Sequence, residues 1–408
     1  MRAVWFLVFA ILCLATLPQG KPAGKSRSWI TSTFLDWVEG SPGDGGANTY
    51  VAADGTVRLI NLWDLNRDGA IDIIFPHTHE HNEAVDLFIY WGRNGYTPSG
   101  RTSLPTNGAK SAAAADLNGD GFPDLVVVNN FNGTRTDLGS YIYWGSAAGY
   151  SAKRRAELPT MGGEAVAIAD LNGDGALDLV FANSGLSYHV SVDDFRKSYI
   201  YWGNSRGEYD PSRRSILGTI NARDVAVTDL NRDGHPDIIF ANEGNTDSES
   251  GVVIYWGAQG GNFTADRSQA LPGQRSSAVA VGDLDGNGYS DIAVANAFRL
   301  KGRELGMYNI VDTVAVDSFL YWGSAEGFST SRRTALPTVG AQDVQIGDMN
   351  ADKRPEVVFA NGSGGASYIY WNGTSGFTPN RRTALPASSS HCAIADLNRD
   401  GLPDVVLS

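Results

Sequence analysis

One acidic phrase, Asp-x-Asn-x-Asp-Gly-x-x-Asp, recurs along this chain of 408 residues and constrains its fold more than any other feature. Seven copies, some of them imperfect, begin 48 to 65 residues apart, at Asp64, Asp116, Asp170, Asp229, Asp283, Asp348 and Asp396. Similarity at a period of this length is typical of solenoids and propellers, which repeat one supersecondary unit. The chain is therefore expected to fold as a ring or stack of similar units.

Each unit contains four runs with the composition of short strands. In the third copy a small apolar run at 165–169 precedes the acidic phrase, and a second apolar run at 178–183 follows it. A Tyr-Trp-Gly phrase at 201–203 ends the third run, and an Arg-rich stretch forms the fourth. Four strands in each of seven copies predict an all-β fold, a single seven-bladed β-propeller. A β-solenoid is the alternative, although its repeats are usually shorter.

The two ends of the chain are expected to share the last blade. The seventh copy stops after its second strand, so its third and fourth strands are missing. Trp37 lies 27 residues before Asp64, close to the 25 to 27 residues that separate the other tryptophans from the next acidic phrase. Residues from about 28 to 60 are therefore predicted to complete the last blade and close the ring, which removes its open sheet edges.

The N-terminus has the pattern of a secretory signal peptide. Met1 and Arg2 precede an unbroken apolar run at 3–15, which is too short to span a membrane comfortably. We expect residues 1–24 to be removed and residues 25–408 to form the mature domain. The protein is then secreted to the extracellular space, or held in the periplasm or at the cell surface. A buried N-terminal helix is the alternative, and no other segment of the sequence has the character of a transmembrane span.

The net charge limits the class of partner, and the cysteine content limits the disulfides that can stabilise the fold. The formal net charge of −13 argues against nucleic acid as a partner. Removal of the leader takes Cys13 with it and leaves Cys392 alone, so the mature chain is expected to have no internal disulfide. Cys392 stands where other copies have valine, which indicates a small buried residue rather than a nucleophile. We expect bound metal to stabilise the fold in place of a disulfide.

The acidic phrases have the composition of calcium-binding loops. Side-chain oxygens at positions 1, 3, 5 and 9 and a carbonyl at position 7 are hard ligands that suit Ca²⁺, and glycine at position 6 permits the sharp turn. Position 12 is apolar and the flanks are strands, so the loops are not EF-hands. A metal-free Asn/Asp-rich turn is the alternative, but seven copies favour the metal.

Up to seven calcium sites are predicted, and two copies depart from the pattern. The fifth exchanges Asp and Asn at positions 3 and 5, whereas the sixth has Lys353 in place of glycine and Glu356 at position 9, which makes its site doubtful. The predicted ligands are Asp64, Asn66, Asp68, Asp72, Asp116, Asn118, Asp120, Asp124, Asp170, Asn172, Asp174, Asp178, Asp229, Asn231, Asp233, Asp237, Asp283, Asp285, Asn287, Asp291, Asp348, Asn350, Asp352, Glu356, Asp396, Asn398, Asp400 and Asp404.

The acidic loops, one per predicted blade, resemble the FG-GAP/VCBS repeats of integrin α-subunit propellers and of a fungal propeller lectin. The resemblance covers nearly all of the predicted mature chain. It implies a seven-bladed fold with Ca²⁺ in the hairpin loops between the first and second strands, at the positions given above. The Gly-Ala-Pro of the family after the second strand is mostly Ala-Asn here, as at 182–183 and 241–242. Such domains serve adhesion, sugar binding and sometimes lyase chemistry, so the fold alone does not fix the function.

Variable loops are expected on the face opposite the acidic loops, where the second and third strands of each blade are joined. The stretch from position 9 to the next Trp varies from 15 to 31 residues, and the longest insert spans about 297–317. Loops of variable length are where binding residues gather. Four of the six histidines fall in these loops, and His391 precedes the first strand of the last blade on the same face.

Some of these loop residues form a candidate catalytic site. The phrase His-Thr-His-Glu-His at 77–81 places three imidazoles at alternate positions, where they could bind Zn²⁺ or supply a general base. A solvated polar loop is the alternative. The candidate residues are His77, His79, His81, Tyr188, His189 and Arg303.

The repeated Trp and Arg residues have structural interpretations. Each Trp is expected to pack between blades, and each Arg to lie on the outer edge strand, where it discourages edge pairing or stacks on that Trp. An aromatic residue that binds a sugar is expected to be an unrepeated one, such as Phe131, Tyr188 or Phe298.

Taken together, the sequence favours a monomeric, non-catalytic recognition or adhesion module. Its expected ligand is an extracellular carbohydrate, with a protein ligand as the second choice. The alternative is a polysaccharide lyase that uses the His/Tyr/Arg group on the long-loop face, and a purely structural domain is a third interpretation.

Overall fold

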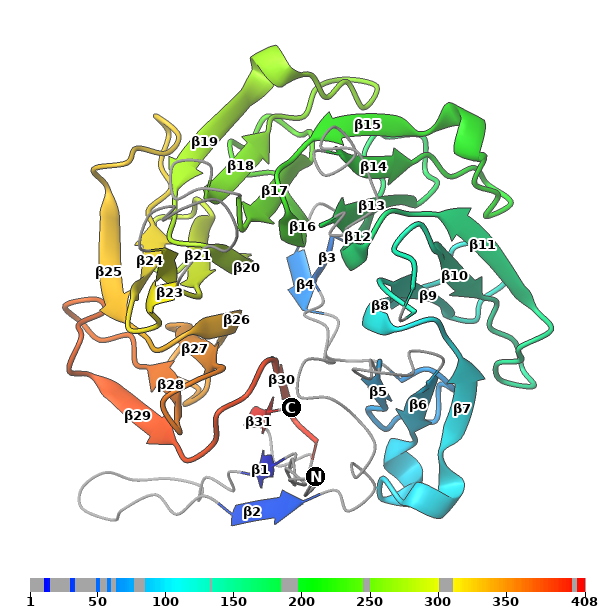
Figure 1. Ribbon diagram of the computed structural model, residues 1–408, viewed down its shortest axis with the longest axis horizontal. Helices are drawn as coiled ribbons and strands as arrows, with labels where there is room; N and C mark the ends of the chain where they lie inside the picture. Colours follow the sequence, from blue (N-terminus) through cyan, green and yellow to red (C-terminus); the bar gives the residue numbers. More distant parts are fainter. Residues whose placement is uncertain are drawn as a thin grey trace.

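The computed structural model describes residues 11–14, 30–33, 49–51, 57–59, 64–76, 85–132, 134–184, 197–244, 250–300, 311–397 and 402–407. The described regular structure is β-strand with a few single-turn 3₁₀ helices, at Gly92–Asn94, Pro98–Gly100, Pro211–Arg213 and Ala265–Arg267. The sheets are arranged around a common centre, each with one edge toward it (Figure 1). The fold is a β-propeller, as the repeat predicts.

Five consecutive blades are complete antiparallel sheets whose strands follow chain order from the centre outward. The second blade contains β8 (Ala109–Ala115), β9 (Asp124–Asn129), β10 (Gly139–Tyr143) and β11 (Arg155–Pro159). The third contains β12 (Gly163–Ala169), β13 (Asp178–Asn183), β14 (Lys197–Tyr201) and β15 (Ser215–Gly218). The fourth contains β16 (Ala222–Thr228), β17 (Asp237–Asn242), β18 (Gly251–Tyr255) and β19 (Ser268–Pro272).

The remaining blades follow the same plan with local differences. The fifth contains β20 (Ser276–Gly282), β21 (Asp291–Asn296), β24 (Asp317–Tyr321) and β25 (Arg333–Pro337), and its long insert carries the two-stranded pair β22 (Arg299–Leu300) and β23 (Val311–Thr313). The sixth contains β26 (Ala341–Gly347), β27 (Glu356–Asn361), β28 (Ser367–Tyr370) and β29 (Arg382–Leu385). The first has three described strands, β5 (Ile73–Phe75), β6 (Asp86–Tyr90) and β7 (Thr102–Pro105).

The last sheet joins both ends of the chain. It has the order β2 (Ile30–Thr33), β1 (Ile11–Leu14), β31 (Asp404–Leu407) and β30 (Cys392–Ala395), with β1 antiparallel to β31. The N-terminal segment therefore completes this sheet, as expected, although β1 lies within the predicted leader. Trp37 lies outside the described residues.

The prediction that residues up to about 60 belong to the last blade is wrong for one hairpin. Strands β3 (Thr49–Val51) and β4 (Val57–Leu59) form a hairpin, and β3 pairs with β12 of the third blade through Tyr50 and Ile168. An innermost strand leaves one edge of backbone hydrogen-bonding groups facing the centre, and β3 uses that edge. The spacing of tryptophans carries no information about such a pairing.

The core lies between neighbouring blades. The second strand of each complete blade is buried along its whole length, for example β13 and β17. Val180 and Phe240 belong to a cluster that is shared by the third and fourth blades. A sheet that is covered on both faces needs near-continuous apolar strands, which explains why these runs do not alternate with polar residues.

The repeated Trp residues lie between blades and are hydrogen-bonded to their own outer strand. Trp202 packs against the core cluster of the third and fourth blades, and its ring would collide with a Cβ at Gly261. Its Nε1 donates to the Ser215 hydroxyl at 2.9 Å. Trp322 and Trp371 make the equivalent bond to a threonine. The expectation of a packing role for these residues is confirmed.

The repeated Arg residues lie on the outer strands, but they do not stack on Trp as one of our predictions had it. The guanidinium of Arg155 lies 4.1 Å from the centre of the Tyr141 ring, and Arg333 lies 4.2 Å from that of Phe319. Register explains the difference, because Arg155 pairs directly with Tyr143 and so faces the aromatic residue two positions earlier. The preceding arginine, Arg154, donates to the Gly149 carbonyl instead.

Candidate metal centre

In the second to sixth blades each acidic loop connects the innermost strand to the next strand, and its side chains fold back on its own backbone. In the second blade the Asp116 carboxylate accepts hydrogen bonds from the amides of Asp120 and Gly121, at 3.1 and 2.8 Å. Asn118 Oδ1 accepts from the same Asp120 amide at 2.9 Å. Gly121 has φ of +91°, a conformation that other residues rarely adopt. These bonds hold the side-chain oxygens at positions 1 and 3 against the amides in the second half of the loop.

The position-9 carboxylate is buried and joins the loop to the third strand. Asp178 accepts a hydrogen bond from Leu171 N at 2.9 Å and another from Gly203 N at 2.8 Å. Gly203 is the glycine of the Tyr-Trp-Gly phrase, and a Cβ there would collide with the Leu177 carbonyl oxygen. The same pair of bonds recurs in the first, second, fourth and fifth blades.

This anchoring role was missed by the sequence analysis, which treated position 9 as a metal ligand alone. The recurrence of Gly directly after five of the six repeated Trp residues was the available signal. Burial raises the pKa of Asp178 from its ordinary value to about 7, partly offset by the two amide donors. A buried carboxylate with a raised pKa is held more readily as an anion when a cation lies beside it.

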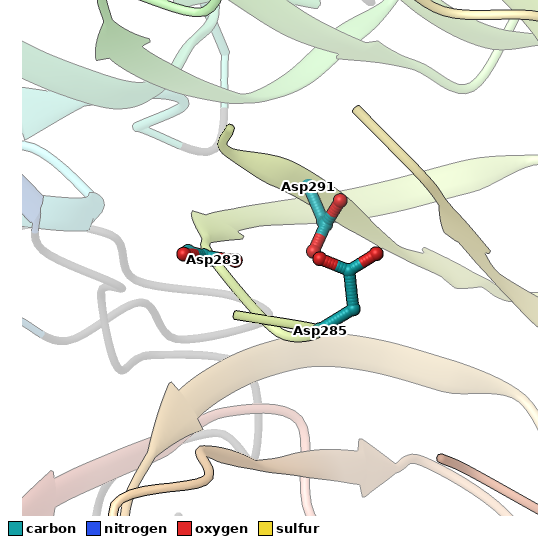
Figure 2. Close-up of side chains that lie close together, drawn as sticks. All are labelled: Asp283, Asp285 and Asp291. Carbon is teal, nitrogen blue, oxygen red and sulfur yellow. The ribbon is translucent and has the colours of Figure 1, made fainter. Parts of the chain in front are cut away.

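The fifth loop brings three carboxylates together (Figure 2). Ligand oxygens of Asp283, Asp285 and Asp291 all lie within 4.8 Å of one another, the closest such acidic group in the described part of the chain. Asp285 makes the difference, because the other copies have asparagine at position 3. Burial, with Asp285 and Asp283 nearby, raises the pKa of Asp291 to about 7. Three clustered anions with oxygen donors fit a hard divalent cation, which would relieve their repulsion.

The chain's repeats match a known family over most of its length. The FG-GAP-like repeat family matches residues 64–127, 116–181, 182–240, 229–294 and 348–407. The chain belongs to this FG-GAP-like repeat family. The matched segments contain all seven acidic loops. Residues 295–347, which include the long insert and the first strand of the sixth blade, lie between two matches.

Curated proteins that resemble this FG-GAP-like chain are much longer. Integrin alpha-4 of Xenopus laevis is 31% identical over 147 residues, which cover 32% of this chain and 14% of the relative. Integrin alpha-7 of Mus musculus is 35% identical over 174 residues, covering 35% and 14%. Phosphatidylinositol-glycan-specific phospholipase D of Mus musculus is 28% identical over 155 residues, covering 33% and 18%. The matched part therefore spans less than a fifth of each of these relatives.

The sixth loop differs from the others in the way its charges are satisfied. Asn350 Nδ2 donates to Glu356 Oε1 at 3.1 Å, so an amide donor faces the position-9 carboxylate. Arg354 forms an ion pair with Asp352 at 3.1 Å. Lys353 adopts φ of +68° where the other loops have glycine. Arg354 offsets the charge of Asp352, and Asn350 occupies an oxygen of Glu356, so fewer acceptor oxygens remain for a cation. The departure of this loop from the repeat pattern predicts the same weakness.

Part of the predicted set of site residues lies outside the described residues. In the seventh loop these are Asn398 and Asp400, while Leu397 N donates to Asp404 at 3.0 Å as in the other copies. The whole candidate catalytic group is also outside: His77, His79, His81, Tyr188, His189 and Arg303. Among the described residues no helix has the length and apolarity of a membrane span.

Proposed function

We propose that this chain is a secreted, seven-bladed propeller that binds Ca²⁺ in its acidic loops and acts as a non-catalytic recognition or adhesion module. Its favoured ligand is an extracellular carbohydrate. The observation that carries the proposal is the clustering of Asp283, Asp285 and Asp291 in a loop whose pattern recurs in the other blades. Metal in such loops would hold the first two strands of each blade together. The long loops on the opposite face would then carry the recognition site.

Calcium is the cation we propose because the donors are carboxylate, amide and carbonyl oxygens in flexible loops. Ca²⁺ accepts six to eight such ligands without strict geometry, whereas Mg²⁺ demands a near-ideal octahedron. We assign the ligands to positions 1, 3, 5 and 9 of each loop and regard the loop at 348–356 as the weakest site. Glu356 and Asp352 already make contacts within the loop, to Asn350 and Arg354, and these contacts support that ranking.

We also propose that residues 1–24 are a leader that is removed on export and that residues 25–408 form the propeller as a monomer. Removal would take away β1 and expose the edge of β31, so another N-terminal segment has to replace it beside β31. N-terminal sequencing of the exported protein tests this directly. A mature protein that still begins at Met1 would contradict it.

The recognition function is tested on a glycan array with the mature protein in the presence of Ca²⁺. Selective retention on one class of sugar, lost when EDTA removes the metal, is the expected result. Deletion of residues 299–315 is expected to weaken retention if the long-loop face carries the site. A blank array would contradict carbohydrate recognition and favour a protein ligand. Cleavage of a retained polysaccharide would contradict the non-catalytic assignment.

A further inference from the structure

A cavity of about 390 Å³ lies at the central end of the blades, on the side away from the acidic loops. The acidic loops follow the C-terminal ends of the innermost strands, whereas the cavity is lined from the N-terminal ends of the same strands. Lys110, Glu164, Arg223, Ser277 and Gln342 contribute to its wall. The cavity is within the size range of small-molecule sites, which is roughly 300 to 1,000 Å³.

These wall residues occupy the same position in successive repeats. Each is the second residue of its innermost strand, where the pairing register with the next strand shifts by one residue. A bulge of this kind re-aims one side chain without breaking the rest of the strand. The residue at the bulge differs in each blade, while the position two residues later is alanine or valine throughout. The backbone geometry at this position is therefore the same in each of these blades, while the side chains that line the cavity differ.

An ion-pair network fixes one side of the cavity. Arg223 contacts the Glu164 carboxylate of the third blade at 2.8 Å and that of Glu243, which follows β17, at 2.5 Å. Asn130 Nδ2 also donates to Glu164 at 3.1 Å. The side chain of Glu164 is only 9% exposed, so this arrangement is rigid and its remaining carboxylate oxygens are preset as acceptors.

Two further cations line the cavity and have no carboxylate partner among the described residues. Lys110 is half-buried at the wall. Arg275 is 4% exposed, lies over the Phe298 ring at 5.4 Å, and donates to backbone carbonyls, but its Nε has no hydrogen-bond partner in the described part of the chain. Burial, with Lys110 nearby, lowers the pKa of His391 to about 3, so that imidazole adds no charge. Three cations and two carboxylates therefore line the cavity itself, while Asp224 and Asp343, whose pKa values are raised by burial to about 7 and about 8, line its narrow extension.

A second buried polar atom, the Ser111 hydroxyl, lies at the same place. Ser111 follows Lys110 and lines a narrow extension of the cavity. Ser111 is 2% exposed, and its hydroxyl has no hydrogen-bond partner among the residues that the structure describes. Buried polar groups are rarely left unsatisfied, because each costs about 1–3 kcal/mol. Both atoms are enclosed by protein, so a ligand in the cavity reaches the Ser111 hydroxyl or the Arg275 Nε only if neighbouring atoms move.

We infer that this cavity binds a sugar residue that carries a carboxylate, an inference that rests on the proposed carbohydrate recognition and names its ligand class. The carboxylate pairs with Lys110, which has no carboxylate partner among the described residues. The sugar hydroxyls, which both donate and accept, meet Glu164 on the neighbouring strand and Gln342 farther around the wall. Phe298, one of the unrepeated aromatic residues singled out in the sequence, gives an apolar surface for the C–H face of the ring.

Calorimetric titration of the calcium-loaded mature protein tests this inference. The probes are trigalacturonate against neutral galactotriose, and sialyllactose against lactose, which distinguish a uronate from a nonulosonate as the source of the carboxylate. One acidic probe is expected to bind at least tenfold more tightly than its neutral counterpart. Lys110→Gln is expected to weaken that binding about tenfold, the worth of one charge-assisted contact. Lys153→Gln, the same change at an exposed turn, is the matched control and is expected to bind like the parent.

Thermal unfolding of each variant first establishes that it is folded, and Phe298→Leu is a second variant that leaves the charges untouched. If acidic and neutral probes bind equally, or if Lys110→Gln and Phe298→Leu both bind like the parent, the inference is wrong while carbohydrate recognition survives. If no glycan binds to the protein under any condition, the proposed function fails together with it.

Discussion

At the scale of single residues, charged side chains in this protein are positioned chiefly by backbone geometry. Arg223 reaches two carboxylates because a bulge re-aims it, and Asp178 is buried because two backbone amides converge on it. The sequence located the acidic loops, since their pattern repeats. It did not identify the anchoring bonds of position 9 or the stacking partner of the Arg residues. Both depend on which strand residues face each other, and a linear pattern does not contain that pairing.

Replacing Arg223 by alanine is expected to destabilise the protein by about 3 kcal/mol, because Glu164 and Glu243 are left as neighbouring carboxylates without their shared cation. Arg206→Ala is the matched control. Arg206 pairs with Glu208 at 3.9 Å and its side chain is 80% exposed, so its loss is expected to cost about 0–1 kcal/mol. Urea unfolding of the two variants measures both values. Equal losses would show that the network contributes no more than a surface pair.

Asp343 gives the protein a pH-dependent stability. It accepts hydrogen bonds from its own neighbour Val344 and from Cys392 in the last sheet, at 2.7 and 2.9 Å. Burial, with Asp224 nearby, raises its pKa from 3.8 to about 8. The folded state therefore binds this proton more tightly than the unfolded state, and stability is lost as pH rises from about 4 to about 8, by at most about 1.4 kcal/mol per pH unit.

The comparison of the parent with Asp343→Asn tests this contribution, together with its coupling to Asp224, because raised carboxyls far from Asp343 titrate equally in both proteins. Unfolding free energies are measured across that pH window at saturating Ca²⁺. The asparagine variant is expected to lose less stability than the parent between the two ends of the window. Parallel profiles would rule out Asp343 as the titrating group.

At the scale of the element, the repeating unit of this fold is the hairpin of the first two strands of a blade. Its acidic loop is held by hydrogen bonds within the loop and by the position-9 carboxylate, which also accepts a bond from the glycine after the Trp. The strands and the loops could be predicted from composition and period, since each blade repeats them. The hairpin of β3 and β4 could not, because its partner β12 lies far along the chain and is selected by an available strand edge. The axial cavity could not be predicted either, because it results from the meeting of several blades, although the sequence did single out Phe298.

The two roles of the fifth loop can be separated by substitution. Asp291→Asn keeps the shape but replaces one acceptor by a donor that faces the amide of Leu284 or Gly323, so a loss of about 1–3 kcal/mol is expected even without metal. Asp285→Asn restores the residue that the other loops have and is expected to change metal-free stability little. Thermal unfolding in EDTA compares them. A metal-free Asp285→Asn protein that is as unstable as Asp291→Asn would contradict the anchoring role of position 9.

At the scale of the whole molecule, the acidic loops and the cavity lie at opposite ends of the same innermost strands. Each acidic loop holds the C-terminal end of such a strand, and the residues at its N-terminal end line the cavity. A cation that fixes the loops would therefore keep the cavity wall in register from a distance. Because adjacent innermost strands contact one another around the centre, loss of several cations is expected to loosen the ring as a unit.

The most direct test of this account is thermal unfolding of the mature protein with saturating Ca²⁺, with Mg²⁺ and with EDTA. A cation that binds only the folded state stabilises it by about 2.7 kcal/mol per site when present at one hundred times its dissociation constant. We predict a large increase in the unfolding temperature with Ca²⁺ that Mg²⁺ does not reproduce. An unfolding temperature that is the same with Ca²⁺ and with EDTA would contradict the central claim that calcium holds this propeller together.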